Sequence, residues 1–532
     1  IKDLKEEDRE YKIFALDGLT KGCQVEYHYT VKKYPAFFGR EIIASNFPVM
    51  KSRFDLITPG HLHFETKSFN NLPACKDTLI GEKRALYVEA EGLDASEEEK
   101  YSMFDASLKR VEYKLSFNKA SADKTRLFTW NELARKAYAL YTDVSEKERK
   151  RIRDLVKEAG VKEGQSEAEK IMAIENFFKK HYIAREELDD EDAADLLKVI
   201  KSKVSSERAY CKLIGAALTE AGVPFQIVLA GDRSDYTIDR NLENWSNARH
   251  FLFYFPGTRK YMAPTATVFR YPWIPPNWTN TNGLFCVATS IGGMNTAIAE
   301  IRSIPMEEYK HSFLNMDIKA KLDDEGESLE LDVAQSYGGY AAGNYRVPFV
   351  YYDAEDQRKF MKELIKFGTN SENILSQSLE NKEMEQSDPY VPFIIKAKVK
   401  SAQLVERAGN KIIVKVGEFI GQQSEMYETK ERKTDIDVTY PHALVRTIEL
   451  TLPQGYEVKN LKDLQFNEVY KEKEQLTMGF VCTYEQTGNV LRITIREDYA
   501  RYHYPLEQYP AFKKVINAAA DFNKVVLVLE KK

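Results

Sequence analysis

The spacing of apolar residues divides the chain into stretches with different periods. In the first, apolar and polar positions alternate, which is typical of half-buried β-strands. Strands are predicted there over residues 11–16, 23–31, 41–45, 62–69, 85–90 and 109–117. We therefore expect a β-rich N-terminal domain over 1–120.

From Trp130 the apolar spacing changes to three and four residues, the period of an amphipathic helix. Helices are predicted over 130–142, 145–159, 166–182 and 192–201. From about Asp317 the strand pattern returns, over 315–322, 328–336, 391–400, 411–416, 445–452, 475–484 and 490–496, with one helix over 354–367. The pattern as a whole predicts an α+β multidomain protein, with a core over 125–305 and a β-rich C-terminal domain over 310–532.

The stretch from Ser205 to Thr265 combines a helix with strands in an order that suggests a reactive site. Serines at 205–206 can start a helix that carries Cys211 in its first turn, and Gly222 and Pro224 end it. Strands are then expected over 225–230, from His250 to 255, and over 259–265. This order can bring Cys211 close to His250.

When a cysteine lies beside a histidine, the cysteine can act as a nucleophile and the histidine as the base that accepts its proton. The thiolate is the reactive form, and both a helix N-terminus and an imidazolium stabilise it. A third group normally holds the imidazole in the useful tautomer. Taken singly, Cys211 is equally compatible with a buried core thiol, since Ile214 and Leu218 continue its apolar stripe. His250 alone is equally compatible with a packed strand histidine.

These segments resemble the transglutaminase-like superfamily, in particular a bacterial branch with a β-rich N-terminal domain. The resemblance lies in Ala209-Tyr210-Cys211-Lys212-Leu213, in Arg249-His250 and in Tyr261-Met262-Ala263-Pro264-Thr265. It implies a papain-like core with a Cys-His-Asp triad and a β-rich C-terminal domain. It also implies that the chain begins partway into the N-terminal domain, in a protein exported to the cell envelope or periplasm. Ile1 at the start fits a processed precursor.

The match to the triad is incomplete. Cys211 and His250 occupy the first two positions, but Ala263 stands where the family carries aspartate. The role of that aspartate could instead fall to one of four residues, Thr265, Asp232, Asp235 or Asp239. Donors for an oxyanion remain open between the Tyr210–Cys211 backbone and Gln226.

Composition limits the kinds of molecule that the protein is expected to bind. A net charge of −5 over 532 residues favours neither nucleic acid nor an anionic membrane. No apolar run is long enough for a transmembrane helix. The five cysteines are widely spaced and form no zinc pattern. We expect no metal and no cofactor, since the pair His61 and His63 lacks a third ligand and the acidic stretch 186–192 lacks the glycine of a calcium loop.

The aromatic loop after the core, residues 271–278, carries two tryptophans. Trp273 and Trp278 either line a groove for substrate or pack the loop onto its domain.

Two functions remain open. The first is a cysteine protease, amidase or acyl transferase acting on peptide or glutamine amides, in which Cys211 attacks the carbonyl carbon and His250 transfers the proton. Its catalysis is expected to be impaired because Ala263 replaces the aspartate. The second is a binding or scaffold protein built on a degenerate core. Either takes a peptide or protein as its partner, and the sequence leaves the oligomeric state open.

Overall fold

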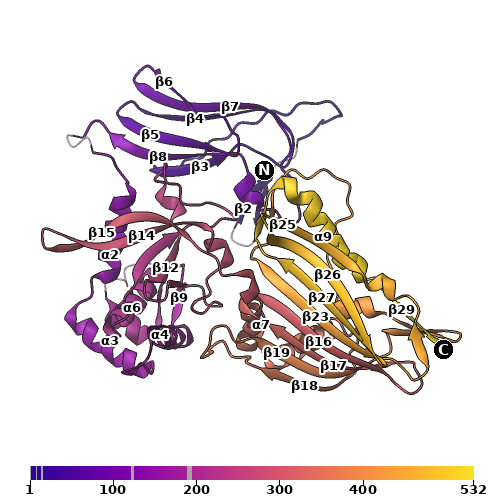
Figure 1. The fold of residues 1–532 in the computed structure, drawn as a ribbon. Helices are drawn as coiled ribbons and strands as arrows, with labels where there is room; N and C mark the ends of the chain where they lie inside the picture. The colour runs from indigo at the N-terminus through magenta and orange to yellow at the C-terminus, as the bar shows by residue number, and fades with distance from the viewer. Residues whose placement is uncertain (1, 7–8, 14–15, 122–124, 189–194) are drawn as a thin grey trace. The chain divides into compact units, whose positions relative to one another are not determined.

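The computed structural model describes residues 2–6, 9–13, 16–121, 125–188 and 195–532, and Figure 1 traces them along the chain. They belong to two compact units, residues 1–37 and residues 38–532. Three parts of the sequence predictions lie outside the described residues. They are residues 14–15 of the predicted strand 11–16, residues 192–194 of the predicted helix 192–201 and residues 189–192 of the acidic stretch 186–192.

The first unit contains a hairpin of β1 (Lys2–Glu6) and β2 (Arg9–Ile13). The strand predicted over 23–31 is wrong, because this segment has no regular secondary structure and pairs with no described strand. Its Tyr27 and Tyr29 are exposed and stack on each other. An alternating pattern gives a stable strand only where a neighbouring strand and a buried face exist.

Residues 38–118 form two three-stranded antiparallel sheets. The first has the order β3 (Phe38–Ile42), β8 (Arg110–Asn118), β5 (Leu62–Phe69), and the second β4 (Val49–Pro59), β7 (Lys83–Leu93), β6 (Lys76–Ile80). Val88 of β7 and Val111 of β8 belong to one buried cluster, so the two sheets pack on each other. The strands predicted near 62, 85 and 109 are confirmed.

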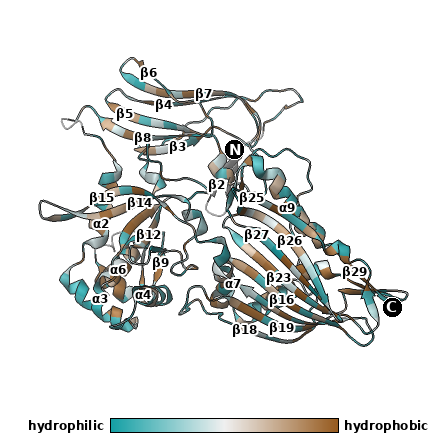
Figure 2. Ribbon diagram, in the orientation of Figure 1, coloured by the Kyte–Doolittle hydropathy of each residue, from teal (hydrophilic) through white to brown (hydrophobic). Residues whose placement is uncertain are grey.

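Helices follow from Trp130, as predicted. They are α2 (Trp130–Thr142), α3 (Glu146–Glu158), α4 (Glu167–His181), α5 (Leu196–Ser202) and α6 (Glu207–Glu220). Ser145 and Ser166 each begin a helix with a capping box, in which the serine and a glutamate three residues later satisfy each other's backbone N–H groups. Figure 2 shows α3 as largely hydrophilic, as expected for a helix that covers the core from outside.

A five-stranded antiparallel sheet packs against these helices. Its order is β13 (Lys260–Met262), β12 (His250–Phe255), β11 (Gln226–Ala230), β14 (Thr281–Ile291), β15 (Met294–Ile304). One face of the sheet, with Leu229 and Phe253, shares a buried cluster with α6. The other face, with Leu252 and Ala263, forms a separate buried cluster.

The C-terminal part is built on an eight-stranded sheet. Its order is β18 (Ile374–Glu380), β19 (Phe393–Ser401), β17 (Leu329–Tyr337), β16 (Phe313–Leu322), β23 (His442–Thr451), β27 (Val490–Tyr499), β26 (Gln475–Thr487), β25 (Phe466–Glu472). A four-stranded sheet accompanies it, with the order β20 (Val405–Ala408), β21 (Lys411–Val414), β29 (Leu527–Lys531), β24 (Tyr456–Val458). The α+β, β-rich fold class is as predicted.

Three helices accompany these sheets in the described part of the chain, and two of them were not predicted. They are α7 (Gly339–Tyr351), the predicted α8 (Ala354–Lys366) and α9 (Tyr509–Phe522). Helix α7 contains two glycines and Pro348, which weaken the helical signal in the sequence. Helix α9 packs Phe522 against Phe466 and Phe480 of the sheet.

Candidate functional site

Cys211 lies on α6, where Ser206 caps the helix by accepting a hydrogen bond from the backbone N–H of Ala209. Cys211 is the fifth residue of the helix and therefore lies in its second turn, so the prediction of a first-turn position is wrong. The field of a helix N-terminus weakens beyond the first turn. Its stabilisation of a thiolate at Cys211 is correspondingly small.

His250 is the first residue of β12 and pairs with Ala230 of β11. Because side chains alternate along a strand, His250 shares a face of the sheet with Leu252 and Ala263. Helix α6 packs on the opposite face. The two candidate residues therefore approach each other around the end of β12 and not across a single face.

Cys211 and His250 nevertheless line one cavity of about 1030 Å³. Other residues that line it are Glu186, Glu207, Thr265 and Trp278. Among the described residues, no hydrogen bond joins the Cys211 thiol to the His250 ring. The predicted pair thus lines one cavity.

The His250 ring instead stacks on Trp278, with ring centroids 4.0 Å apart and planes inclined by 14°. Trp278 ends a short 3₁₀ helix, Pro276–Trp278, in the aromatic loop. Trp278 packs the loop onto its domain by covering the imidazole, and it also borders the cavity. The prediction that this loop lines a groove for substrate stays a prediction.

Burial controls the protonation of Cys211. It raises the pKa of the thiol well above its ordinary value, and the neighbouring Glu207 carboxylate raises it further. Lys179 opposes this effect but does not outweigh it. Cys211 is therefore a neutral thiol at neutral pH.

His250 is also kept neutral. Burial lowers the pKa of its imidazole, and the charge of Arg249 lowers it further, against the carboxylates of Asp232 and Asp235. Both shifts disfavour a thiolate–imidazolium pair, which characterises an activated cysteine.

Ala263 lies where the resembled family carries the aspartate of its triad, and its backbone makes a contact there. Ala263 is buried, and its carbonyl accepts a hydrogen bond of 2.8 Å from Lys179 Nζ. The same ammonium group donates to Glu175 and to the carbonyls of Ala266 and Phe269 at 2.8 to 3.0 Å. Lys179 therefore fixes the loop that follows β13. The contact leaves position 263 without a carboxylate that could orient His250.

The four residues that could replace the missing aspartate lie in different surroundings. Thr265 lines the cavity. Asp232 accepts hydrogen bonds from Ser234, Asp235 pairs with Arg249, and Asp239 pairs with Lys67. Of these carboxylates, Asp232 and Asp235 act on the pKa of His250.

Gln226, proposed as an oxyanion donor, is not brought to the site. It lies at the end of β11 opposite Ala230, about 13 Å along the strand, where its side chain accepts a hydrogen bond from Arg302.

Two residues of the site escaped sequence reasoning. Lys179 lies four residues after Glu175 on the apolar stripe of α4, and this spacing of opposite charges was the available signal. Glu207 follows the capping serine on α6, and no spacing in the sequence relates it to the thiol. No cluster of three or more potential metal ligands occurs in the described ranges. No described helix has the length and apolar character needed to cross a membrane.

Comparison with known proteins supports the fold. The model of a domain of unknown function, DUF3858, matches residues 410–529. The crystal structure of a putative protease from Parabacteroides distasonis is similar over 93% of this chain and 76% of that one, with 9% sequence identity and a TM-score of 0.51. No curated protein matches the chain. At this identity the likeness concerns the fold alone.

Proposed function

We propose that the chain is a transglutaminase-like protein that binds a peptide or glutamine amide in the Cys211 cavity with little capacity to cleave it. The single observation that carries this proposal is that Cys211 and His250 share a cavity of about 1030 Å³ while the thiol is buried and lacks a hydrogen bond to the imidazole. The cavity supplies room for an extended segment, and Trp278 supplies an apolar wall.

The weakness of catalysis follows from the steps that cleavage would need. Cys211 Sγ would have to lose its proton to His250 before attacking the carbonyl carbon, and the imidazolium would then protonate the leaving amine. Burial disfavours the thiolate, and no carboxylate at position 263 stabilises the imidazolium. In a complete triad, spoiling the aspartate alone costs about 10⁴ in turnover.

A second candidate function is an active cysteine amidase or acyl transferase. The observation in its favour is that Asp232 and Asp235 both raise the pKa of His250 and so act in the sense expected of an orienting carboxylate. In this account substrate binding would bring His250 to the thiol.

An activity assay separates the two functions. The full chain is incubated with quenched fluorescent casein to detect hydrolysis, and with methylated casein and a fluorescent primary amine to detect transamidation. Cys211→Ala is the matched control. We expect the parent and the control to give the same background rates. Turnover in the parent that disappears in Cys211→Ala would support the active enzyme instead.

A binding assay tests the other half of the proposal. Fluorescein-labelled, glutamine-containing peptides should increase in anisotropy with the parent and bind less tightly to Trp278→Ala. Tyr427→Ala serves as control, because Tyr427 is an exposed aromatic residue that lines neither the Cys211 cavity nor the cavity around Arg346. Equal binding by the parent and Trp278→Ala would contradict the assignment of this cavity.

We also propose a location in the cell envelope. This rests on the resemblance to an exported bacterial branch. Fractionation of cells that express the native gene tests it, and recovery with cytoplasmic markers would refute it.

A further inference from the structure

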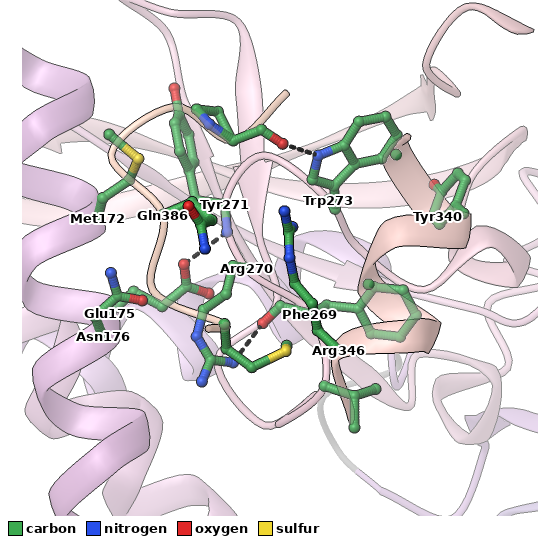
Figure 3. Close-up of a pocket in the computed structure, with 15 residues that line it drawn as sticks. Met172, Glu175, Asn176, Phe269, Arg270, Tyr271, Trp273, Tyr340, Arg346 and Gln386 are labelled. Carbon is green, nitrogen blue, oxygen red and sulfur yellow. Dashed lines mark hydrogen bonds between the residues drawn. The ribbon is translucent and has the colours of Figure 1, made fainter. Parts of the chain in front are cut away.

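A second cavity, of about 40 Å³, lies apart from the Cys211 cavity and shares none of its residues. Helix α4, the loop over residues 268–273, helix α7 and the loop over residues 384–389 enclose it. Figure 3 shows Arg346, Arg270 and Trp273 among the side chains that line it. The proposed function makes no use of this cavity.

Arg346 places a buried cation in the wall. Only 6% of the residue is exposed, and its guanidinium donates from Nε to the carbonyl of Asn381 and from Nη2 to that of Val391, both at 2.8 Å. Within the described part of the chain, no carboxylate lies within 4.0 Å of it and Nη1 has no protein acceptor. Burial lowers the pKa of Arg346 to about 10, so the group stays charged at neutral pH.

Arg270 adds a second cation to the same wall. Its Nη1 donates to the carbonyls of Thr267 and Phe269, at 2.6 and 2.9 Å. Its Nε is buried without a hydrogen-bond acceptor. No described carboxylate forms an ion pair with it.

The carboxylate that does line the cavity is already neutralised. Glu175 pairs with the ammonium of Lys179 at 2.8 Å and accepts a hydrogen bond of 2.6 Å from the backbone N–H of Tyr271. Glu383 acts on Arg346 only from beyond ion-pair distance. The cavity wall therefore keeps a net positive charge in a buried setting, which is costly unless an anion compensates it.

Trp273 and Tyr340 form an aromatic part of the wall. Trp273 donates from its indole N–H to the carbonyl of Pro389 at 2.9 Å, and its ring packs edge-on against Tyr340. Gly339 has a positive φ of 57°, and a Cβ there would lie 2.8 Å from the Trp273 ring. This glycine thus permits the close approach of α7 that shapes the cavity.

We propose that this cavity binds a carboxylate group. Its volume of about 40 Å³ corresponds to roughly three water molecules, which suits a carboxylate with a short apolar stem. An arginine fork with a free edge recognises carboxylate geometry, and the aromatic wall disfavours a more strongly hydrated dianion. The carboxylate comes either from a small free acid or from the C-terminus of a peptide.

Titration of the full chain with four probes tests the proposal. The probes are acetate, an alanine pentapeptide with a free C-terminus, the same peptide as its amide, and inorganic phosphate, followed by calorimetry or NMR. The titrations are made with the parent and with Trp278→Ala, which lacks the aromatic wall of the Cys211 cavity. Acetate or the peptide acid should bind saturably to both, while the amide and phosphate should not bind to Trp278→Ala. Tighter binding of the peptide acid than of acetate indicates a chain terminus as the source, and equal binding indicates a small acid.

Variants separate recognition from folding. Arg346→Gln should weaken carboxylate binding by about tenfold or more, the range expected for loss of a charged hydrogen bond. Gly343→Leu keeps both arginines but fills open space on the same face of α7, one turn before Arg346, and should abolish binding. The matched control Arg358→Gln removes an exposed charge outside the cavity and should bind as the parent does.

Three results would overturn the proposal. The first is that no carboxylate binds saturably, or that phosphate binds and the carboxylates do not. The second is that Trp278→Ala binds the peptide amide as well as the acid. The third is that folded Gly343→Leu binds a carboxylate with the affinity of the parent. This test does not depend on whether Arg346→Gln folds.

Discussion

His250 and Trp278 lie face to face, with ring centroids 4.0 Å apart, so the imidazole of the candidate base is covered by an indole. The stack removes one face of the imidazole from water. It thereby contributes to the burial that lowers the pKa of His250.

Replacing Trp278 with alanine should therefore raise the pKa of His250 toward the ordinary value of about 6.5. Water would reach the exposed ring face and stabilise the charged form. An NMR titration of the histidine side chains measures this shift. Trp278→Phe keeps an aromatic partner and should leave the pKa close to that of the parent, whereas an unchanged pKa in Trp278→Ala would show that the stack does not control it.

Lys179→Met should lower the free energy of unfolding by about 3–5 kcal/mol, because it leaves Glu175 as an uncompensated buried charge. The neighbouring Lys180→Met, at an exposed position, should change it by less than about 0.5 kcal/mol. Chemical denaturation measures both. A small effect of Lys179→Met would mean that the loop after β13 is held by other contacts.

The same lysine gives a pH signature. Burial lowers the pKa of Lys179 to about 8, whereas an unfolded lysine titrates near 10.5. Between these values the unfolded chain binds more protons, so the contribution of Lys179 to stability should rise with pH. Denaturation of the parent and of Lys179→Met across this window tests the sign. The parent should gain stability over Lys179→Met as the pH rises through this window, so the difference between them should grow, and a constant or shrinking difference would contradict the prediction.

Residues 125–305, predicted to fold as a unit, have a hydrophobic cluster that lies wholly within 130–297. Excised, they should remain soluble and unfold cooperatively on heating. Contacts such as the pair of Lys114 with Glu243 cross the predicted boundary and would be lost. Heating the fragment and the intact chain side by side tests the boundaries, which would be wrong if only the fragment aggregates.

The sequence predicted the parts of the fold that depend on local periodicity. Helix α2 begins and ends at the predicted residues because Thr129 caps an amphipathic run. Helix α7 was missed, since its glycines and Pro348 are poor helix formers that tertiary packing overrides. The strand predicted over 23–31 was wrong for the opposite reason. Its alternating apolar and polar residues favour a strand, but no described strand pairs with this segment.

The candidate site was predicted in part for similar reasons. The order of elements placed Cys211 and His250 on one cavity. The ring stack with Trp278 and the four hydrogen bonds of Lys179 join segments distant in sequence, and no local pattern encodes them. The burial of Cys211, which decides its protonation, likewise depends on the packed core.

The rate of alkylation of Cys211 against pH, followed residue by residue with mass spectrometry, tests the central claim most directly. The exposed Cys23 of the same chain is the internal reference for an accessible thiol. The account predicts slow modification of Cys211 near neutral pH and a rate that rises only at alkaline pH. Ala263→Asp should speed the reaction near neutral pH by favouring charged His250, and His250→Ala in that background should cancel the gain. Rapid alkylation of the parent near pH 6, unchanged by Ala263→Asp, would contradict the account, because another residue would then already hold His250 in its active form.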